Sequence, residues 1–464
     1  MKREIKKVLV ANRGEIAVRI LRACHDLDIN TVAIYSKEDI LSGFRTKADE
    51  SYMIGETLSP LGAYLAIDEI VAMAKKRGVD AIHPGYGFLS ENADFARACE
   101  REGIIFIGPS SDVLGKMGDK LSAKELADRC NVPTIPGSTD PLKSAEDAVE
   151  RANSYGYPVI LKAAAGGGGR GMRACYNDAE VAQAFELVSE EARKSFGNDA
   201  IFMEKFLVEP KHIEVQILAD EYGNIVHLYE RDCSLQRRYQ KVIEYTPAFS
   251  LPEEVLEKIR NEAVKIAREV GYTSVGTVEF LVDKDMNHYF IEMNPRIQVE
   301  HTVTEVVTGI DLVRAQILVA AGEPLSHPVI GVTCQEDVKT RGFALQCRVT
   351  TEDPENNFAP DTGKITAYRS GGGNGVRLDG GNIYTGAVIS PYYDSLLVKI
   401  TTYDSTFQGV VRKARRSLTE MRVRGVKTNI AFLGKILQNP VFLEGRCHTK
   451  FIDETPELFQ LDDS

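Results

Sequence analysis

Acidic and amide side chains alternate with apolar ones in segment 276–301, which holds the residues best suited to bind a metal ion. Two runs rich in Val, Ile, Phe and Tyr flank the polar segment 284–287, which predicts a β-hairpin. In that register Glu279 lies opposite Glu292, and Asn294 follows on the same face. Facing carboxylates repel each other unless a cation lies between them. Two carboxylates and an amide suit Mg²⁺ or Mn²⁺, so we expect a metal site; the alternative is a solvated face with two unrelated acids.

Composition limits the class of protein. The chain has 464 residues, 43% of them hydrophobic and 27% charged, as in ordinary globular enzymes of two or three domains. A net charge of −11 argues against a nucleic-acid partner. The apolar runs are too short for a membrane span, and the N-terminus leads directly into a strand, so we expect no signal or transit peptide. The eight cysteines lack a Cys-x-x-Cys pair, which favours reduced thiols in a cytoplasmic protein.

The first quarter of the chain predicts a doubly wound parallel sheet. Expected strands alternate with expected helices, and the clearest are strands at 7–11 and 31–35 and a helix at 16–27. The first strand–helix turn carries only Gly14, so the dinucleotide fingerprint is missing. His83 begins a loop beyond a strand, where such sheets place ligands; a structural role in the turn is equally consistent with this position.

A glycine-rich loop at 166–171 joins two expected strands, so it is neither a P-loop nor a Rossmann turn. Glycines let backbone N–H groups approach an anion and let a loop move. Lys162 ends the strand before the loop and Arg170 lies inside it, which favours a lid over phosphate groups; a flexible linker is the alternative.

Further polar residues follow along the chain. His212, Glu214 and Gln216 share one face of an alternating strand. The basic run 231–244 alone favours a solvated loop, but beside a metal hairpin it becomes a candidate anion site. Arg348 lies mid-strand among apolar neighbours and therefore needs an anionic partner, either a structural ion pair or a ligand.

Taken together, seven segments in this order resemble the ATP-grasp biotin carboxylases over nearly the whole chain; they are 11–17, 83–92, 118–120, 166–172, 230–234, 292–301 and 392–395. The resemblance implies a mixed α/β and α+β protein of three domains: a Rossmann-like N-terminal domain at 1–118, an ATP-grasp domain at 119–340 with a mobile lid at about 133–206, and an α+β C-terminal domain at 341–464.

The same resemblance implies carboxylation of biotin with MgATP and bicarbonate, and it assigns roles by matching position. ATP is expected at Lys120, Lys162, Gly167, Gly168, Gly169, Glu204, Lys205, Leu207, His212, Gln236, Glu279 and Glu292. The metal is expected at Glu279, Glu292 and Asn294, and bicarbonate at Lys241, Arg296, Gln298, Val299 and Glu300. Glu300 is the expected base, and Arg348, with His83, is expected at biotin, where Arg348 stabilises the enolate. Tyr239 stands where the family often has His.

Segments 347–354, 358–364 and 451–459 resemble the version found in pyruvate carboxylases, where further domains follow. No Met-Lys-Met attachment motif occurs, so we expect biotin to arrive on a carrier domain or protein. A carboxyltransferase domain or partner subunit and a homo-oligomer are also expected. The alternatives are the biotin carboxylase subunit of acetyl-CoA carboxylase, another ATP-grasp ligase of the carbamoyl phosphate synthase type, and a catalytically silent nucleotide-binding module.

Overall fold

A computed structural model describes residues 2–118, 120–138, 140–163, 172–196, 200–381 and 383–461. Contacts divide the chain into two compact units: unit 1 holds Met1–Cys130, Lys211–Phe280 and Glu292–Ser464, and unit 2 holds Asn131–Pro210 and Leu281–Ile291. The three domains expected from the sequence, at 1–118, 119–340 and 341–464, stay a prediction.

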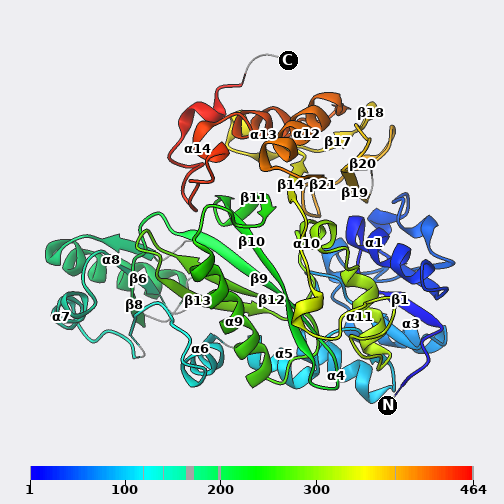
Figure 1. Cartoon of the computed structure of the whole chain (residues 1–464), viewed down its shortest axis with the longest axis horizontal. Helices are drawn as coiled ribbons and strands as arrows, with labels where there is room; N and C mark the ends of the chain where they lie inside the picture. The colour runs from blue at the N-terminus through cyan, green and yellow to red at the C-terminus, as the bar shows by residue number, and fades with distance from the viewer. Residues whose placement is uncertain are drawn as a thin grey trace. The chain divides into compact units, whose positions relative to one another are not determined.

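Unit 1 begins with a parallel sheet of five strands in the order β3-β2-β1-β4-β5 (blue in Figure 1). The predicted doubly wound arrangement is confirmed. The strands are β1 (Lys7–Val10), β2 (Asn30–Tyr35), β3 (Glu50–Met53), β4 (Ala81–His83) and β5 (Ile105–Phe106), and the helices are α1 (Gly14–His25), α2 (Pro60–Ala63), α3 (Ile67–Lys76), α4 (Ala93–Arg101) and α5 (Ser111–Gly118). β1 is buried on both faces, as its unbroken apolar run requires.

An eight-stranded sheet follows, in the order β13-β12-β9-β10-β11-β14-β21-β19. Its strands are β9 (Lys211–Ala219), β10 (Ile225–Arg237), β11 (Gln240–Thr246), β12 (Ser274–Val282), β13 (His288–Asn294), β14 (Phe343–Thr350), β19 (Val376–Gly380) and β21 (Leu396–Asp404). β12 and β13 are neighbours, which confirms the predicted hairpin. The basic run 231–244 is mostly strand and mostly buried, so the solvated-loop reading of this run is wrong.

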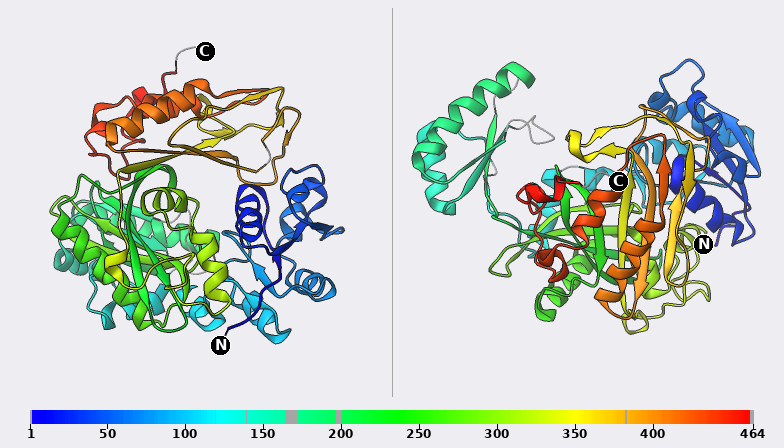
Figure 2. Two further views of the ribbon diagram at one scale, coloured as in Figure 1. Left: turned by 45° about the vertical axis from the view of Figure 1, so that its right-hand side comes forward. Right: turned by 90° about the horizontal axis from the view of Figure 1, so that it is seen from above.

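Helices cover this sheet, and their apolar faces explain their positions. α12 (Phe407–Glu420) lies across β14 and β21 and packs Val410 and Ala414 into one core with Leu345 and Ile400 (Figure 2). The other helices of this part are α6 (Lys120–Arg129), α9 (Glu253–Glu269), α10 (His301–Thr308), α11 (Leu312–Ala320), α13 (Ile430–Ile436) and α14 (Pro440–Leu443). Short strands complete it: β15 (Glu352–Asp353), β16 (Ala359–Pro360), β17 (Gly363–Lys364), β18 (Ala367–Arg369), β20 (Val388–Ile389) and β22 (Arg422–Arg424).

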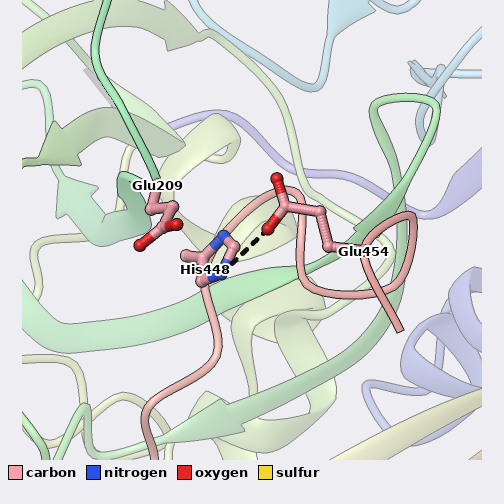
Figure 3. A group of neighbouring side chains, drawn as sticks. All are labelled: Glu209, His448 and Glu454. Atoms are coloured by element: carbon pink, nitrogen blue, oxygen red, sulfur yellow. Dashed lines mark ion pairs between the residues drawn. The ribbon is translucent and has the colours of Figure 1, made fainter.

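The segment after α14 turns back on itself through side-chain contacts. His448 Nε2 lies 3.7 Å from a carboxylate oxygen of Glu454 (Figure 3).

Among the residues that the structure describes, no helix combines the length and apolarity needed to cross a membrane.

Unit 2 is a small α+β body. Three antiparallel strands, β6 (Val159–Ala163), β7 (Met172–Cys175) and β8 (Ile201–Lys205), lie in the order β7-β6-β8, with helices α7 (Ala145–Tyr155) and α8 (Asp178–Phe196). β6 alternates buried and half-buried residues, so Leu161 enters the core while Lys162 points to the opposite face.

Candidate active site

Arg231 is the buried centre of the polar face formed by β9, β10 and β12. Its side chain is fully buried, and each of its five N–H groups donates a hydrogen bond. The acceptors are Glu214 Oε1, Gln216 Oε1 at 2.7 Å, Thr304 Oγ1 at 2.9 Å, Thr277 Oγ1 at 3.2 Å and Gln298 Oε1 at 2.9 Å. A buried guanidinium is stable only when it is paired and fully hydrogen-bonded, so Arg231 holds residues of β9, β12, α10 and the turn before α10 in fixed positions.

Lys241, on β11, brings three carboxylates together. Its ammonium contacts Glu214, Glu279 at 3.1 Å and Glu300 at 2.7 Å. Burial alone would lower the pKa of Lys241, but Glu214, Glu300 and Glu279 outweigh it and raise this pKa well above its usual value. The group is therefore a permanent cation at the point where the carboxylates meet.

Glu300 pairs with a second cation besides Lys241. Arg348, on β14, donates to Glu300 Oε2 at 2.9 Å and also pairs with the buried Glu244. Burial would raise the pKa of Glu300, but Lys241, Arg348 and Arg231 outweigh it and hold this pKa well below the usual range. Glu300 is thus ionised and lies between two cations, either of which an incoming anion can engage.

The oxygen ligands predicted for the metal lie together. Asn294 Nδ2 donates to Glu279 Oε1 at 3.0 Å, and His212 Nε2 lies 3.0 Å from Glu279 Oε2. Partial removal from solvent, and next the charge of Glu279, raise the pKa of Glu292, so these two carboxylates do interact. This oxygen-rich set, in which two neighbouring carboxylates repel each other, fits a hard divalent cation. Their role as metal ligands stays a prediction.

The remaining residues predicted for bicarbonate surround this cluster. Arg296 donates to Asn294 Oδ1 at 2.9 Å and lies 3.1 Å from Glu91. Gln298 donates to Glu279 Oε1 at 2.9 Å, and Val299 is half-buried in the turn before Glu300. The structure therefore brings Lys241, Arg296, Gln298, Val299 and Glu300 into one polar cluster.

In unit 2, Lys162 and Glu204 form an ion pair across β6 and β8. The register pairs Ile160 with Glu204, which puts Glu204 and Lys162 on the same face. The Lys205 ammonium donates to the backbone carbonyls of Gly156 at 2.7 Å and Tyr157 at 2.8 Å, so its aliphatic stem and backbone remain for a ligand. Leu207 is half-buried. Gly167, Gly168, Gly169 and the Lys120 side chain lie outside the described residues.

Gln236 lies near the end of β10, and Tyr239 lies in the turn that joins β10 to β11. Gln236 is buried and donates to the Cys233 carbonyl at 3.0 Å. Arg238 and Tyr239 have φ of 49° and 64° in a two-residue hairpin turn, the conformation that matches strand twist. Tyr239 is 74% exposed, so it is free to meet a ligand without disturbing the fold.

His83, at the carboxyl end of β4, is fully buried. Its Nδ1 accepts from Gly85 N–H at 3.0 Å and its Nε2 lies 3.2 Å from Gln316 Oε1. Both ring nitrogens have partners, as expected for a histidine that holds a turn. Contact of His83 with biotin stays a prediction, and its burial favours the structural alternative.

Acid sensitivity is the first testable consequence. Burial lowers the pKa of His83 to about 3. Burial and the nearby Lys399 lower the pKa of His301 to about 3 as well. In the unfolded chain both titrate near 6.5, so protons favour unfolding as the pH falls from about 6.5 toward 3. We expect the free energy of unfolding to fall by roughly 1.4 kcal/mol per pH unit for each histidine in this window.

Urea unfolding at about pH 7 and about pH 5.5 measures this loss, because ordinary carboxylates barely titrate there. The variant His83→Gln removes one titrating group and is expected to flatten the pH dependence. An unchanged slope in that variant would contradict the prediction.

Two functional neighbours were missed from the sequence, Glu214 and Glu244. Glu214 was placed on the polar face of its strand but given no role; its ion pairs with Lys241 and Arg231 show what it does. Glu244 pairs with Arg348 because β11 and β14 are neighbours, with Glu244 opposite Gln346. Alternation could have flagged Glu214, but nothing local indicates the partner of Glu244.

Known proteins resemble this chain throughout its length. Family models match residues 4–114 as "Biotin carboxylase, N-terminal domain", 119–328 as "Carbamoyl-phosphate synthase L chain, ATP binding domain" and 346–454 as "Biotin carboxylase C-terminal domain". The middle match places the chain in a class of ATP-binding enzymes. A pyruvate carboxylase of Aspergillus terreus is 58% identical over 99% of this chain, which spans 38% of that protein.

Solved structures agree. The biotin carboxylase domain of the Hydrogenobacter thermophilus 2-oxoglutarate carboxylase, a dimer in complex with MgADP and bicarbonate, is 47% identical with a TM-score of 0.90 and covers 99% of both chains. The biotin carboxylase subunit of a pyruvate carboxylase is 49% identical with a TM-score of 0.87, covering 99% of this chain and 100% of the other.

The chain belongs to the biotin carboxylase family. Within this family it is similar to the biotin carboxylase part of pyruvate carboxylases.

Proposed function

We propose that this chain catalyses the ATP- and bicarbonate-dependent carboxylation of biotin, as the first half-reaction of a pyruvate carboxylase. The observation that carries the proposal is the position of Glu300. This buried carboxylate contacts Lys241 at 2.7 Å and Arg348 at 2.9 Å, so a base lies directly between two cations. Lys241 also contacts Glu279, one of the predicted metal ligands, whereas Arg348 also pairs with Glu244 of β11.

Bicarbonate would be held by Lys241, Arg296, the Gln298 amide and the backbone of Val299. An anion that engages Lys241 weakens the Lys241–Glu300 pair, which raises the proton affinity of Glu300 at the moment when a base is needed. Glu300 then takes the bicarbonate proton, and the resulting oxyanion attacks the γ-phosphorus of ATP. ADP leaves, and the carboxyphosphate formed supplies CO₂ and phosphate.

Glu279, Glu292 and Asn294 would hold Mg²⁺ or Mn²⁺, which neutralises charge on the ATP phosphates when bound. Lys120, Lys162 and Gly167–Gly169 are proposed at the phosphates. Glu204, Lys205 and Leu207 are proposed at the adenine, and His212 and Gln236 at the ribose.

Arg348 would stabilise the negative charge that develops on the ureido oxygen of biotin when its ring nitrogen loses a proton. Its guanidinium donates through Nε to Glu244 and through Nη2 to Glu300, and it carries further N–H donors. The phosphate released together with CO₂ takes this proton, and the deprotonated nitrogen then attacks CO₂ to give carboxybiotin. Biotin is proposed to arrive on a carrier domain, with a carboxyltransferase that transfers the carboxyl group to pyruvate. A homo-oligomer and a cytoplasmic location complete the proposal.

The test is an assay of the purified chain with MgATP. We expect ATP cleavage that depends on bicarbonate, is stimulated by free biotin and fixes labelled bicarbonate into biotin. Stimulation by ammonia in place of biotin would instead favour a carbamoyl phosphate synthase-type ligase, the class named in the match to 119–328. Identification of the carboxylated product after adding a carrier and carboxyltransferase separates pyruvate from acetyl-CoA and 2-oxoglutarate as acceptors.

The metal set gives the second prediction. Glu292→Gln keeps the side-chain size but removes one negative charge from the set, so MgATP turnover is expected to fall by about 10- to 100-fold. Melting temperature is expected to stay the same or rise, because the repulsion from Glu279 is relieved. Turnover across a Mg²⁺ titration checks this, with Glu257→Gln, another exposed acid of unit 1, as the control. Full activity at ordinary Mg²⁺ would exclude Glu292 as a ligand.

A further inference from the structure

The turn formed by residues 298–300 lies between β13 and α10 and carries three of the residues proposed for bicarbonate. Two buried side chains, His301 and Lys399, hydrogen-bond to backbone carbonyls of this turn. Neither of them belongs to the site described above, and one is tied to segment 11–17, which the proposed function leaves unexplained.

His301 holds the first peptide of the turn. Its side chain is fully buried, and Nδ1 lies 2.7 Å from the carbonyl oxygen of Gln298. A carbonyl oxygen only accepts, so Nδ1 carries the proton. Burial and the nearby Lys399 lower the pKa of His301 to about 3, so the ring stays neutral and keeps this one tautomer.

Lys399 holds the second peptide. This residue of β21 is fully buried, and Nζ donates to the Val299 carbonyl at 3.0 Å. Nζ also lies 3.0 Å from Oε1 of Glu15, a buried residue of α1 that accepts a hydrogen bond from the Tyr86 hydroxyl. A buried ammonium without a counter-ion is costly, so Glu15, together with the buried Asp379 opposite Lys399 in the sheet, makes it possible for a lysine to occupy this position.

Because peptide bonds are planar, these two contacts determine the directions of the backbone N–H groups in the turn. In a planar trans peptide, the C=O and the following N–H point in opposite directions. A Gln298 carbonyl fixed by His301 therefore fixes the direction of the Val299 N–H. In the same way, a Val299 carbonyl fixed by Lys399 fixes the Glu300 N–H and the start of the Glu300 side chain. Val299 has an apolar side chain, so only its backbone can donate to bicarbonate.

We propose that Lys399 and His301 are positioning residues of the bicarbonate site, and that Glu15 holds Lys399 in place for this purpose. The proposal rests on the proposed function. It gives segment 11–17 a role in the reaction: through Glu15 and Lys399, the first helix of the chain fixes a turn almost 300 residues further on.

Kinetics of Lys399→Met test the proposal. The KM for bicarbonate is expected to rise by about tenfold or more, because the turn loses a buried hydrogen bond, while the KM for ATP changes less than about twofold. Lys413→Met is the matched control, since Lys413 also pairs with a carboxylate, Asp404 at 2.8 Å, and a carbonyl, Tyr403 at 2.8 Å. Equal changes in both KM values, or none in that for bicarbonate, would overturn the proposal.

A second pair of variants keeps the test valid where loss of Lys399 unfolds the chain. His301→Phe removes the donor but keeps a flat ring, whereas His301→Asn retains an N–H close to the position of Nδ1. We expect the bicarbonate KM to rise by about tenfold in His301→Phe and to return most of the way in His301→Asn. The same bicarbonate KM in both variants would show that His301 only fills space.

The unaltered chain is measured in the same series. If it shows no bicarbonate-dependent ATP cleavage, the proposed function fails. If it is active and the variants at Lys399 and His301 keep its bicarbonate KM, only the positioning role fails.

Discussion

Replacing Glu300 with alanine is expected to lower both bicarbonate-dependent ATP cleavage and biotin carboxylation strongly, whereas replacing Arg348 with alanine is expected to lower only the carboxylation strongly. We expect losses of roughly 100- to 1000-fold, the usual range for removal of a general base or of a charge-stabilising donor. The difference arises because a proton must leave bicarbonate in both reactions, but negative charge develops on biotin in only one.

The contacts of Arg348 sharpen this prediction. Arg348 pairs with both Glu300 and Glu244, so its loss leaves Glu300 with Lys241 and Arg231 as cationic neighbours and raises its pKa toward the usual value. Glu300 then remains able to act as a base. Biotin-independent ATP cleavage should therefore survive in Arg348→Ala.

Both activities are measured in both variants, with the exposed Arg369→Ala as a control for the loss of an arginine. Equal loss of both activities in Arg348→Ala would show that Arg348 supports the whole cluster. The division of roles between Glu300 and Arg348 would then be wrong.

The local part of the site could be predicted from the sequence. Strand alternation placed Glu279 and Asn294 on one face of a hairpin, and the Asn294–Glu279 hydrogen bond of 3.0 Å joins them there. The doubly wound N-terminal sheet followed from the alternation of strands and helices. In both cases the information lies in spacings of a few residues, which a chain reveals without any knowledge of tertiary contacts.

The partners of the central cations could not be predicted in this way. Glu244 meets Arg348 only because β11 pairs with β14, about 100 residues later, in one particular register. Taken alone, the charges of the run 231–244 favour a solvated loop, and only its place beside the metal hairpin makes it a candidate anion site. Those charges are buried because Arg231 and Lys241 find carboxylates on β9 and β12 and near α10, an outcome fixed by strand order and not by local composition.

Arg231→Met is expected to lower the stability of unit 1 more than any other single change in the site. A buried ion pair broken on one side typically costs about 3–5 kcal/mol, because the remaining charge and polar groups stay buried without partners. Here the loss affects Glu214 together with Gln216, Gln298 and two threonines. We expect the melting temperature to fall by roughly 5–10 °C.

Lys241 still contacts Glu214 in that variant, so part of the buried charge remains compensated. A second change, Glu214→Gln, removes the rest of the unpaired charge. The double variant Arg231→Met with Glu214→Gln is therefore expected to melt at a higher temperature than Arg231→Met alone, a non-additivity that a double-mutant cycle measures. Arg238→Met, in the exposed hairpin turn, is the control. If Arg231→Met melts within about 1 °C of the unaltered chain, its five hydrogen bonds contribute little, and Arg231 cannot be the residue that holds this polar face together.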